Sequence, residues 1–268
     1  MNAICTTCGT QFSDSVAPPA HCPICEDERQ YIGLDGQKWT TLDDLRKSYS
    51  LKLVQEEPNL TSWSIEPHFA IGQRAFLLRT PAGNVLWDCV SLLNDGALDQ
   101  IRACGGVSCL GISHPHYYTT MVEWSRALGN IPVYLHRDDE RWVMRRDQCI
   151  QFWEGETKQL PGGFTLIRCG GHFPGACVLH WPAGADGRGV LLSGDTIQVV
   201  PDRHHVSFMY SYPNYVPLNR PAVEKIARAV EPFAFDRICG AFPKMTIESN
   251  GKEAVQRSAE RYYRAIAF

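Results

Sequence analysis

Two Cys-x-x-Cys pairs near the N-terminus constrain the fold of this 268-residue chain more than any other feature of its sequence. The first pair is Cys5 and Cys8, and the second is Cys22 and Cys25. Each pair directs two thiolates toward one point, and two such pairs complete a tetrahedral four-sulfur site, which is typical of structural zinc. The surrounding segment has few large apolar residues, so it offers no core of its own for four free thiols. We therefore predict that residues 1–30 form a four-cysteine zinc knuckle, similar to a zinc ribbon, whose metal serves folding or docking.

Iron is an alternative metal for this quartet. The spacing resembles the knuckles of rubredoxin, and tetrahedral thiolates suit either metal. A redox protein with a rubredoxin-like iron site therefore stays open as one function.

The composition places the chain among ordinary globular proteins. Apolar residues make up 44% of it and charged residues 21%, which excludes a disordered or fibrous chain. The net charge of −3 argues against nucleic acid as a partner, because such binding needs a basic excess. No stretch approaches the about 18 apolar residues of a membrane span. An odd count of 11 cysteines cannot all pair, and the opening MNAICTTC carries no apolar signal segment. We therefore expect a reduced, cytoplasmic location and no membrane partner.

The rest of the chain divides into a linker and a main body. Residues 31–50 predict a linker with a short helix capped at Thr41. In residues 51–268, strands and helices alternate, with a strand expected at 69–79 and a helix near 138–146. Strands in hairpins together with strands between single helices favour mixed sheets covered by helices.

Histidines follow two of the predicted strands, and an aspartate follows a third. His114 and His116 flank Pro115, and side chains at positions i and i+2 of an extended chain point to the same side. His172 stands in a glycine-rich turn, and Asp195 follows an apolar strand. Taken alone, a His-x-His pair fits surface or structural histidines as well as metal ligands.

The order of these segments resembles the metallo-β-lactamase superfamily, the αββα metallohydrolases. The resemblance rests on His-x-His, then Gly-Gly-His-x-Pro-Gly at 170–175, then Gly-Asp-Thr at 194–196, and covers about residues 60–268. It implies an α/β protein, a four-layer αββα sandwich of two mixed sheets. It also implies that His114, His116 and His172 ligate one metal, with Asp195 where the family's carboxylate bridges to a second.

The sequence departs from the family where the second metal is bound. The family motif His-x-His-x-Asp-His ends here in Tyr118 and Thr119, and Ala241 stands where the family has its final histidine. The resemblance therefore implies a mononuclear site. Tyr118 is able to donate a hydrogen bond to an oxyanion, but an ordinary pKa of about 10 makes it a poor base. The adjacent pair His204 and His205 is a candidate for replacement ligands.

These features predict a hydrolase of a small-molecule substrate. One zinc would activate a water for attack on a small ester or thioester, or on a phosphodiester, with Asp195 and Tyr118 as catalytic residues. Iron is the alternative at this site too. The aromatic run 208–215 is a candidate wall of the substrate pocket, or it packs a long loop against the body. A non-catalytic binding or scaffold protein of the same fold stays open beside the redox protein.

Overall fold

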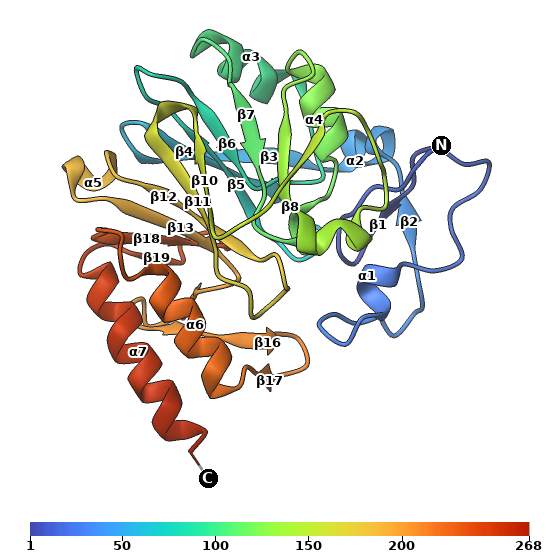
Figure 1. Ribbon diagram of the computed structural model, residues 1–268. Helices are drawn as coiled ribbons and strands as arrows, with labels where there is room; N and C mark the ends of the chain where they lie inside the picture. The colour runs from blue at the N-terminus through green and yellow to red at the C-terminus, as the bar shows by residue number, and fades with distance from the viewer. Residues whose placement is uncertain (268) are drawn as a thin grey trace.

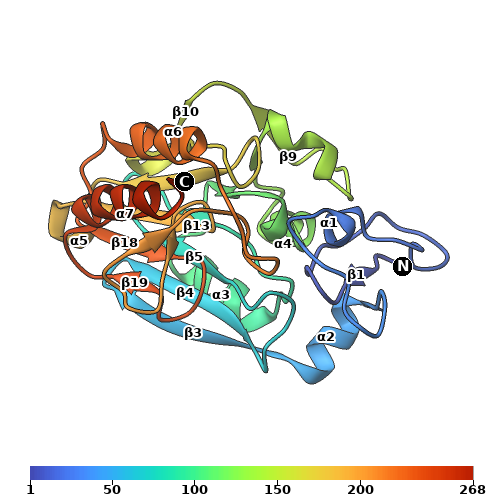
Figure 2. The same ribbon diagram turned by 90° about the horizontal axis from the view of Figure 1, so that it is seen from below.

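Two mixed β-sheets pack face to face in the computed structural model, which describes residues 1–267 (Figures 1 and 2). The first sheet holds seven strands in sequence order: β3 (Ser50–Glu57), β4 (Leu60–Glu66), β5 (Arg74–Leu78), β6 (Val85–Trp87), β7 (Cys109–Gly111), β8 (Val133–His136) and β9 (Ile150–Trp153). Its strands pair antiparallel from β3 to β6 and parallel from β6 to β9.

The second sheet holds six strands, in the order β10 (Thr157–Leu160), β11 (Phe164–Arg168), β12 (Cys177–Trp181), β13 (Val190–Gly194), β18 (Arg237–Gly240) and β19 (Thr246–Ile247). Only β13 and β18 pair in parallel. Three small ladders complete the sheets: β1 (Ile4–Cys5) with β2 (Trp39–Thr40), β14 (Gln198–Val199) with β15 (Val206–Ser207), and β16 (Met209–Ser211) with β17 (Val216–Pro217).

The helices are α1 (Pro23–Glu26), α2 (Leu42–Ser48), α3 (Asp95–Ala103), α4 (Met121–Ala127), α5 (Gly184–Gly187), α6 (Arg220–Val230) and α7 (Gly251–Ala265). Of these, α3 and α4 cover the outer face of the first sheet, and α6 and α7 cover that of the second. In contrast, α1 lies in the N-terminal segment and α5 lies between β12 and β13. Short 3₁₀ turns lie at Pro115–Tyr117, Arg137–Trp142 and Pro161–Gly163. Within residues 1–267, no helix combines the length and the apolar character needed to cross a membrane.

Side-chain alternation along the strands explains the layers. In β5, Phe76 and Leu78 belong to the hydrophobic cluster between the sheets, whereas Leu77 belongs to the cluster under α3 and α4, because successive side chains of a strand face opposite sides. In β13, Leu192 faces the middle cluster and Leu191 faces the cluster under α6 and α7. Three clusters between four layers confirm the predicted αββα sandwich.

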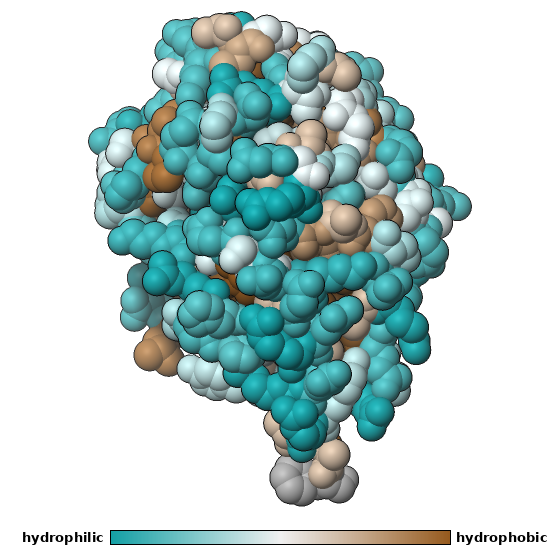
Figure 3. All heavy atoms as spheres, turned by 90° about the vertical axis from the view of Figure 1, so that its left-hand side faces the viewer, coloured by the Kyte–Doolittle hydropathy of each residue, from teal (hydrophilic) through white to brown (hydrophobic). Residues whose placement is uncertain are grey.

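Helix α7 is amphipathic, with polar residues facing solvent and apolar residues facing the second sheet. Glu253, Gln256 and Glu260 are exposed, while Val255 and Ala259 are buried against the second sheet. Figure 3 shows this face of the molecule covered largely by hydrophilic residues, with hydrophobic ones in small separate areas.

Local signals in the sequence were reliable where short-range contacts decide the structure. Thr41 caps α2 as predicted, since its Oγ1 accepts a hydrogen bond of 3.2 Å from the Asp44 amide. The strand expected at 69–79 begins only at Arg74, because Ala70 and Gly72 have positive φ angles of 52° and 75° and form a turn.

The helix expected near 138–146 is wrong. Only a 3₁₀ turn forms over Arg137–Trp142, and Val143 is already extended with φ −80° and ψ 98°. Trp142 and Val143 are adjacent and both buried in the core, so tertiary packing ends the helical turn.

The N-terminal 30 residues pack directly on the body. Ile4, Phe12 and Ile24 belong to the same hydrophobic cluster as Trp63 of the first sheet and Trp124 of α4. Figures 1 and 2 show this blue segment at the right-hand side of the body, near α2 and α4. The boundaries predicted at residues 30 and 50 stay predictions.

Candidate metal centres

The ends of strands from both sheets carry the histidines and the aspartate. His114 follows β7 of the first sheet, and Asp195 directly follows β13 of the second. His172 lies in the loop between β11 and β12. Loops at strand ends lie outside the regular ladders, so their side chains are able to converge on one point.

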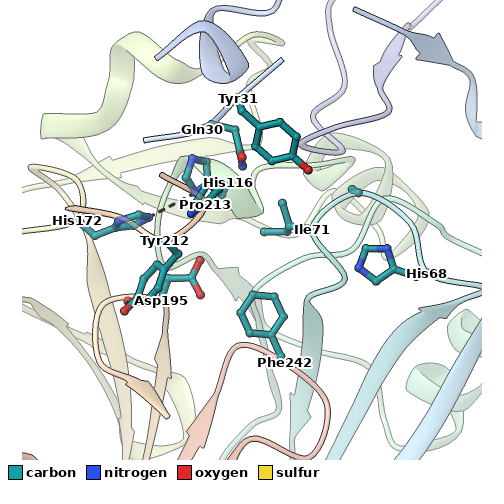
Figure 4. Close-up of a pocket in the computed structure, with 11 residues that line it drawn as sticks. Gln30, Tyr31, His68, Ile71, His116, His172, Asp195, Tyr212, Pro213 and Phe242 are labelled. Carbon is teal, nitrogen blue, oxygen red and sulfur yellow. Dashed lines mark hydrogen bonds between the residues drawn. The ribbon is translucent and has the colours of Figure 1, made fainter. Parts of the chain in front are cut away.

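The structure brings His114, His116, His172 and Asp195 together. One ligand atom from each lies within 4.8 Å of all the others, and all four residues are buried. His172 Nε2 is 3.4 Å from His116 Nδ1, and His114 Nε2 is 3.6 Å from Asp195 Oδ2. Figure 4 shows the rings of His116 and His172 turned toward each other beside the Asp195 carboxylate.

Neighbouring groups fix the orientation of these side chains. His172 Nδ1 lies 2.9 Å from the Tyr210 carbonyl and 3.2 Å from that of Met209. Carbonyl oxygens only accept hydrogen bonds, so Nδ1 carries the proton and the Nε2 lone pair faces the cluster. The Tyr212 hydroxyl donates a hydrogen bond of 2.9 Å to the Asp195 backbone carbonyl.

Several polar atoms of the cluster are buried and unpaired. Within the described part of the chain, His114 Nε2, His116 Nε2 and Asp195 Oδ1 have no hydrogen-bond partner. Burial lowers the pKa of His116 well below its usual value and lowers the pKa of His172 to about 3. These two imidazoles are therefore neutral near pH 7, which is the form that binds metal ions.

Asp88, at the end of β6, supports the cluster from behind. Its Oδ1 accepts a hydrogen bond of 2.7 Å from the Ser113 amide, and the Ser113 hydroxyl lies 3.0 Å from His114 Nδ1. Burial raises the pKa of Asp88 to about 8. Nothing in the sequence pattern indicated this contact between Asp88 and the His-x-His turn.

Other residues that the sequence singled out lie elsewhere. Tyr118 is buried in the hydrophobic cluster under α3 and α4, and it does not line the cavity that opens over the histidines. Burial raises its pKa well above the usual value, and its role as a hydrogen-bond donor to substrate stays a prediction. His205 pairs with Asp202 at 2.8 Å. His204 borders a different cavity, which shares no residue with the one over the histidines.

A cavity of about 280 Å³ opens over the cluster. Apolar and aromatic side chains make up much of its wall, as is common in ligand pockets. His116, His172 and Asp195 form the floor of the cavity, and Tyr212 and Pro213 belong to the predicted aromatic run (Figure 4). No sequence pattern indicated the remaining wall residues, which are Gln30, Tyr31, His68, Ala70, Ile71 and Phe242.

The four predicted knuckle cysteines form a second cluster. Cys5, Cys8, Cys22 and Cys25 are buried, and their sulfurs lie within 4.8 Å of one another. The Cys5–Cys25 and Cys8–Cys22 sulfur separations are 3.5 Å and 3.7 Å. A tetrahedron with metal–sulfur bonds of about 2.3 Å has edges of about 3.8 Å, so the quartet has the dimensions of a four-thiolate metal site.

Comparisons with known proteins identify a relative and a fold. The chain is 51% identical over 265 residues to an uncharacterized protein, YmaE, from Bacillus subtilis (strain 168). The aligned region covers 98% of this chain and 96% of that protein. No family model matches the chain.

Solved structures of metallo-β-lactamases share the architecture. DIM-1 metallo-β-lactamase gives a TM-score of 0.60 at 13% identity over 81% of this chain and 98% of that one. FIM-1 from Pseudomonas aeruginosa, in its mono-zinc form, gives 0.56 at 13% identity over 79% and 96%. A B3 metallo-β-lactamase with an active-site glutamic acid gives 0.55 at 18% identity over 85% and 94%. The likeness at these identities is one of fold.

Proposed function

The chain belongs to the family of YmaE from Bacillus subtilis and has the fold of the metallo-β-lactamases, and from that premise we propose that it is a metal-dependent hydrolase. Its substrate is a small ester or thioester. Its active centre holds one zinc through His114, His116, His172 and Asp195. The observation that carries the proposal is the convergence of these four buried side chains within 4.8 Å beneath a cavity.

The donor set fits a single zinc. Three imidazoles are the protein ligands found in one class of catalytic zinc site, and the buried atoms of His114 and Asp195 that lack a hydrogen-bond partner among residues 1–267 are ligand atoms. Tyr118, Thr119 and Ala241 offer neither imidazole nor carboxylate for a second metal. Iron is the alternative occupant.

When bound, zinc acts as a Lewis acid and makes water nucleophilic at neutral pH. The chain's own residues hold the ligands and shape the space for substrate. The Met209 and Tyr210 carbonyls fix the His172 ring. One oxygen of the Asp195 carboxylate would ligate the metal, and its other oxygen would accept the proton that the attacking water loses. Ile71 and Phe242 form apolar parts of the cavity wall.

The knuckle holds a second zinc with a structural role. Its four sulfurs match tetrahedral geometry, and a closed thiolate site offers no open position to a substrate. None of the 11 cysteines forms a disulfide bond within residues 1–267, which supports a reduced, cytoplasmic location for the protein.

The test compares wild type with His172→Ala. Zinc-loaded protein is assayed with a para-nitrophenyl ester, an acyl thioester and a phosphodiester, and metal content is measured by elemental analysis. We expect two zinc ions per chain, one for each cluster, and hydrolysis that falls to background in the variant together with loss of one zinc.

Each other result has a definite meaning. Hydrolysis that survives in His172→Ala, or a single metal retained in His116→Ala but lost on mutating Cys5, would refute the metallohydrolase. Two bound metals without hydrolysis of any substrate would instead favour the non-catalytic binding protein.

A further inference from the structure

The segment Asp27–Tyr31, which begins just after the four-cysteine knuckle, forms one wall of the cavity over the histidines. Gln30 and Tyr31 line that cavity together with His116 and His172. In Figure 4 the Gln30 amide points toward His116, on the side of the cavity opposite Phe242. A segment far from the histidines in sequence therefore borders their ligand atoms.

Hydrogen bonds hold this segment against the β16–β17 hairpin. Asn214 Nδ2 donates to the carbonyls of Glu28 and Gln30, at 2.9 Å each. The Ser211 hydroxyl donates to the Arg29 carbonyl at 3.1 Å. The hairpin also supplies the carbonyls that orient the His172 ring, so the segment and the ligand share one support.

Arg29 contacts the His172 loop directly. Its Nε donates a hydrogen bond of 2.7 Å to the His172 carbonyl. Its guanidinium lies 4.7 Å from the ring centroid of Phe173 and 4.3 Å from that of Tyr210, and it is only 8% exposed. Asp27 fixes the guanidinium through an ion pair of 2.7 Å. A buried, planar group held on three sides gives the His172 backbone one defined position.

The Gln30 side chain differs from that of Arg29, because it is buried without a partner for its amide oxygen. The residue is 5% exposed, and within residues 1–267 its Oε1 has no hydrogen-bond partner. A buried amide without a partner costs free energy, and this one faces the cavity. A bound molecule with a hydroxyl or N–H group would supply the missing hydrogen-bond donor.

We propose that Gln30 is a substrate-binding residue and that Arg29 is a positioning residue for His172, so the knuckle segment forms part of the active centre. This inference rests on the proposed function and deepens it. Gln30 accepts, at its amide oxygen, a hydrogen bond from a hydroxyl or N–H group of the ester or thioester. Arg29 holds the loop that carries the third histidine. The cysteine-bound metal anchors the segment, because Cys25 lies two residues before Asp27.

Cobalt(II) binding tests Arg29 without relying on activity. Cobalt at the four thiolates gives intense sulfur charge-transfer bands, whereas cobalt at the histidine site gives only weaker visible bands, so the two sites titrate separately. We expect Arg29→Met to weaken cobalt binding at the histidine site by about 10- to 100-fold, as for other residues behind metal ligands, with the thiolate bands unchanged. Arg29→Lys recovers part of the affinity, since it keeps the charge and loses the planar donor.

Asp35→Ala is the matched control, since Asp35 lies in the same N-terminal region with an exposed side chain, and we expect it to bind cobalt like wild type. Arg29→Met with wild-type cobalt affinity at the histidine site would overturn the positioning role. Wild type that binds no cobalt at the histidines would instead refute the proposed function itself.

Gln30→Met tests the substrate contact, because methionine keeps the length of the side chain and removes its hydrogen bonds. We expect unchanged cobalt affinity and acetohydroxamate binding to the cobalt protein weakened by about tenfold, because acetohydroxamate carries N–H and O–H donors. We also expect kcat/KM for the para-nitrophenyl ester of an N-acetyl amino acid, which carries an N–H donor, to fall by about tenfold or more. Unchanged acetohydroxamate affinity together with unchanged kcat/KM would overturn the role of Gln30. The hydroxamate measurement applies even if no ester is hydrolysed.

Discussion

Gly194 lies so close to Ser113 that a Cβ atom on the glycine would be 2.9 Å from the Ser113 hydroxyl oxygen. Gly194 ends β13 of the second sheet, and Ser113 follows β7 of the first. This approach joins the two sheets at the point where His114 faces Asp195, 3.6 Å apart. A residue without a side chain thus sets the distance between two proposed ligands.

Gly194→Ala should therefore damage both stability and metal binding. The new methyl group clashes with Ser113, and φ at this position is +51°, which disfavours residues other than glycine. We expect the free energy of unfolding to fall by about 1–3 kcal/mol and cobalt affinity at the histidine site to fall with it. Gly187→Ala is the control, because φ is +81° there and nothing lies within 4 Å of the added atom. Equal metal affinities in the two variants would show that the Gly194–Ser113 contact does not position the ligands.

Cys25→Ser should remove one metal per chain and loosen the N-terminal segment. The buried quartet loses one thiolate, and metal binding at such a site is coupled to folding. We expect the midpoint of thermal unfolding to fall by about 5 °C or more. Cys104→Ser, a change at a half-buried cysteine outside the quartet, should leave metal content unchanged. Elemental analysis reads the result, and a red wild-type protein would identify iron at the thiolates.

Tyr212→Phe should affect the histidine site beyond its effect on stability. The lost hydroxyl donates to the Asp195 carbonyl, so the backbone that carries this ligand loses a support. Tyr262→Phe is a matched control, because that hydroxyl donates at 3.2 Å to the carbonyl of Leu218, which is not one of the four clustered residues. We expect each variant to lose about 1 kcal/mol in denaturant unfolding, and only Tyr212→Phe to change the visible spectrum of cobalt at the histidines. Identical spectra would count against the link to Asp195.

Asp139 should make stability fall between acidic and neutral pH. It is 1% exposed, accepts a hydrogen bond of 2.9 Å from the Gly175 amide, and burial raises its pKa to about 7. In the unfolded chain its pKa is about 4, so over the range between these values only the folded state keeps the proton. The protonated Asp139 carboxyl therefore stabilises the folded state at low pH, and this stabilisation is lost as the pH rises through about 7.

Denaturant unfolding of wild type and Asp139→Asn at several pH values measures this contribution. Asparagine keeps the acceptor for the Gly175 amide and does not titrate. We expect wild type to lose about 1–2 kcal/mol relative to the variant between about pH 5 and pH 7. Parallel stability curves for the two proteins would show that Asp139 is ionised in the folded state.

Short-range patterns in the sequence identified the four cysteines and the His114–His116 pair, whereas the resemblance to the metallo-β-lactamase superfamily implied that His172 and Asp195 join that pair. The Cys-x-x-Cys pairs and His114-x-His116 each fix their geometry within a few residues, and the Thr41 cap depends on an amide three residues away. Their chemistry follows from residue type and local spacing, which tertiary packing does not alter.

The positions of Arg29, Gln30 and Tyr118 depended on contacts between distant parts of the chain. Arg29 meets the His172 carbonyl across 143 positions, and no periodicity or spacing encodes that meeting. Tyr118 stands next to the His-x-His turn in sequence, yet its side chain is buried in the core.

The sequence by itself determined which residues gather at the two clusters and that the body forms strands and helices of an αββα sandwich. Only the tertiary structure decided that the knuckle segment borders the cavity, that Gln30 faces it, and that His204 and His205 lie elsewhere. The physical reason is that ligand motifs and strand periodicity are local properties of the chain. The wall of a cavity, by contrast, is made where separate segments bury their apolar surfaces against one another.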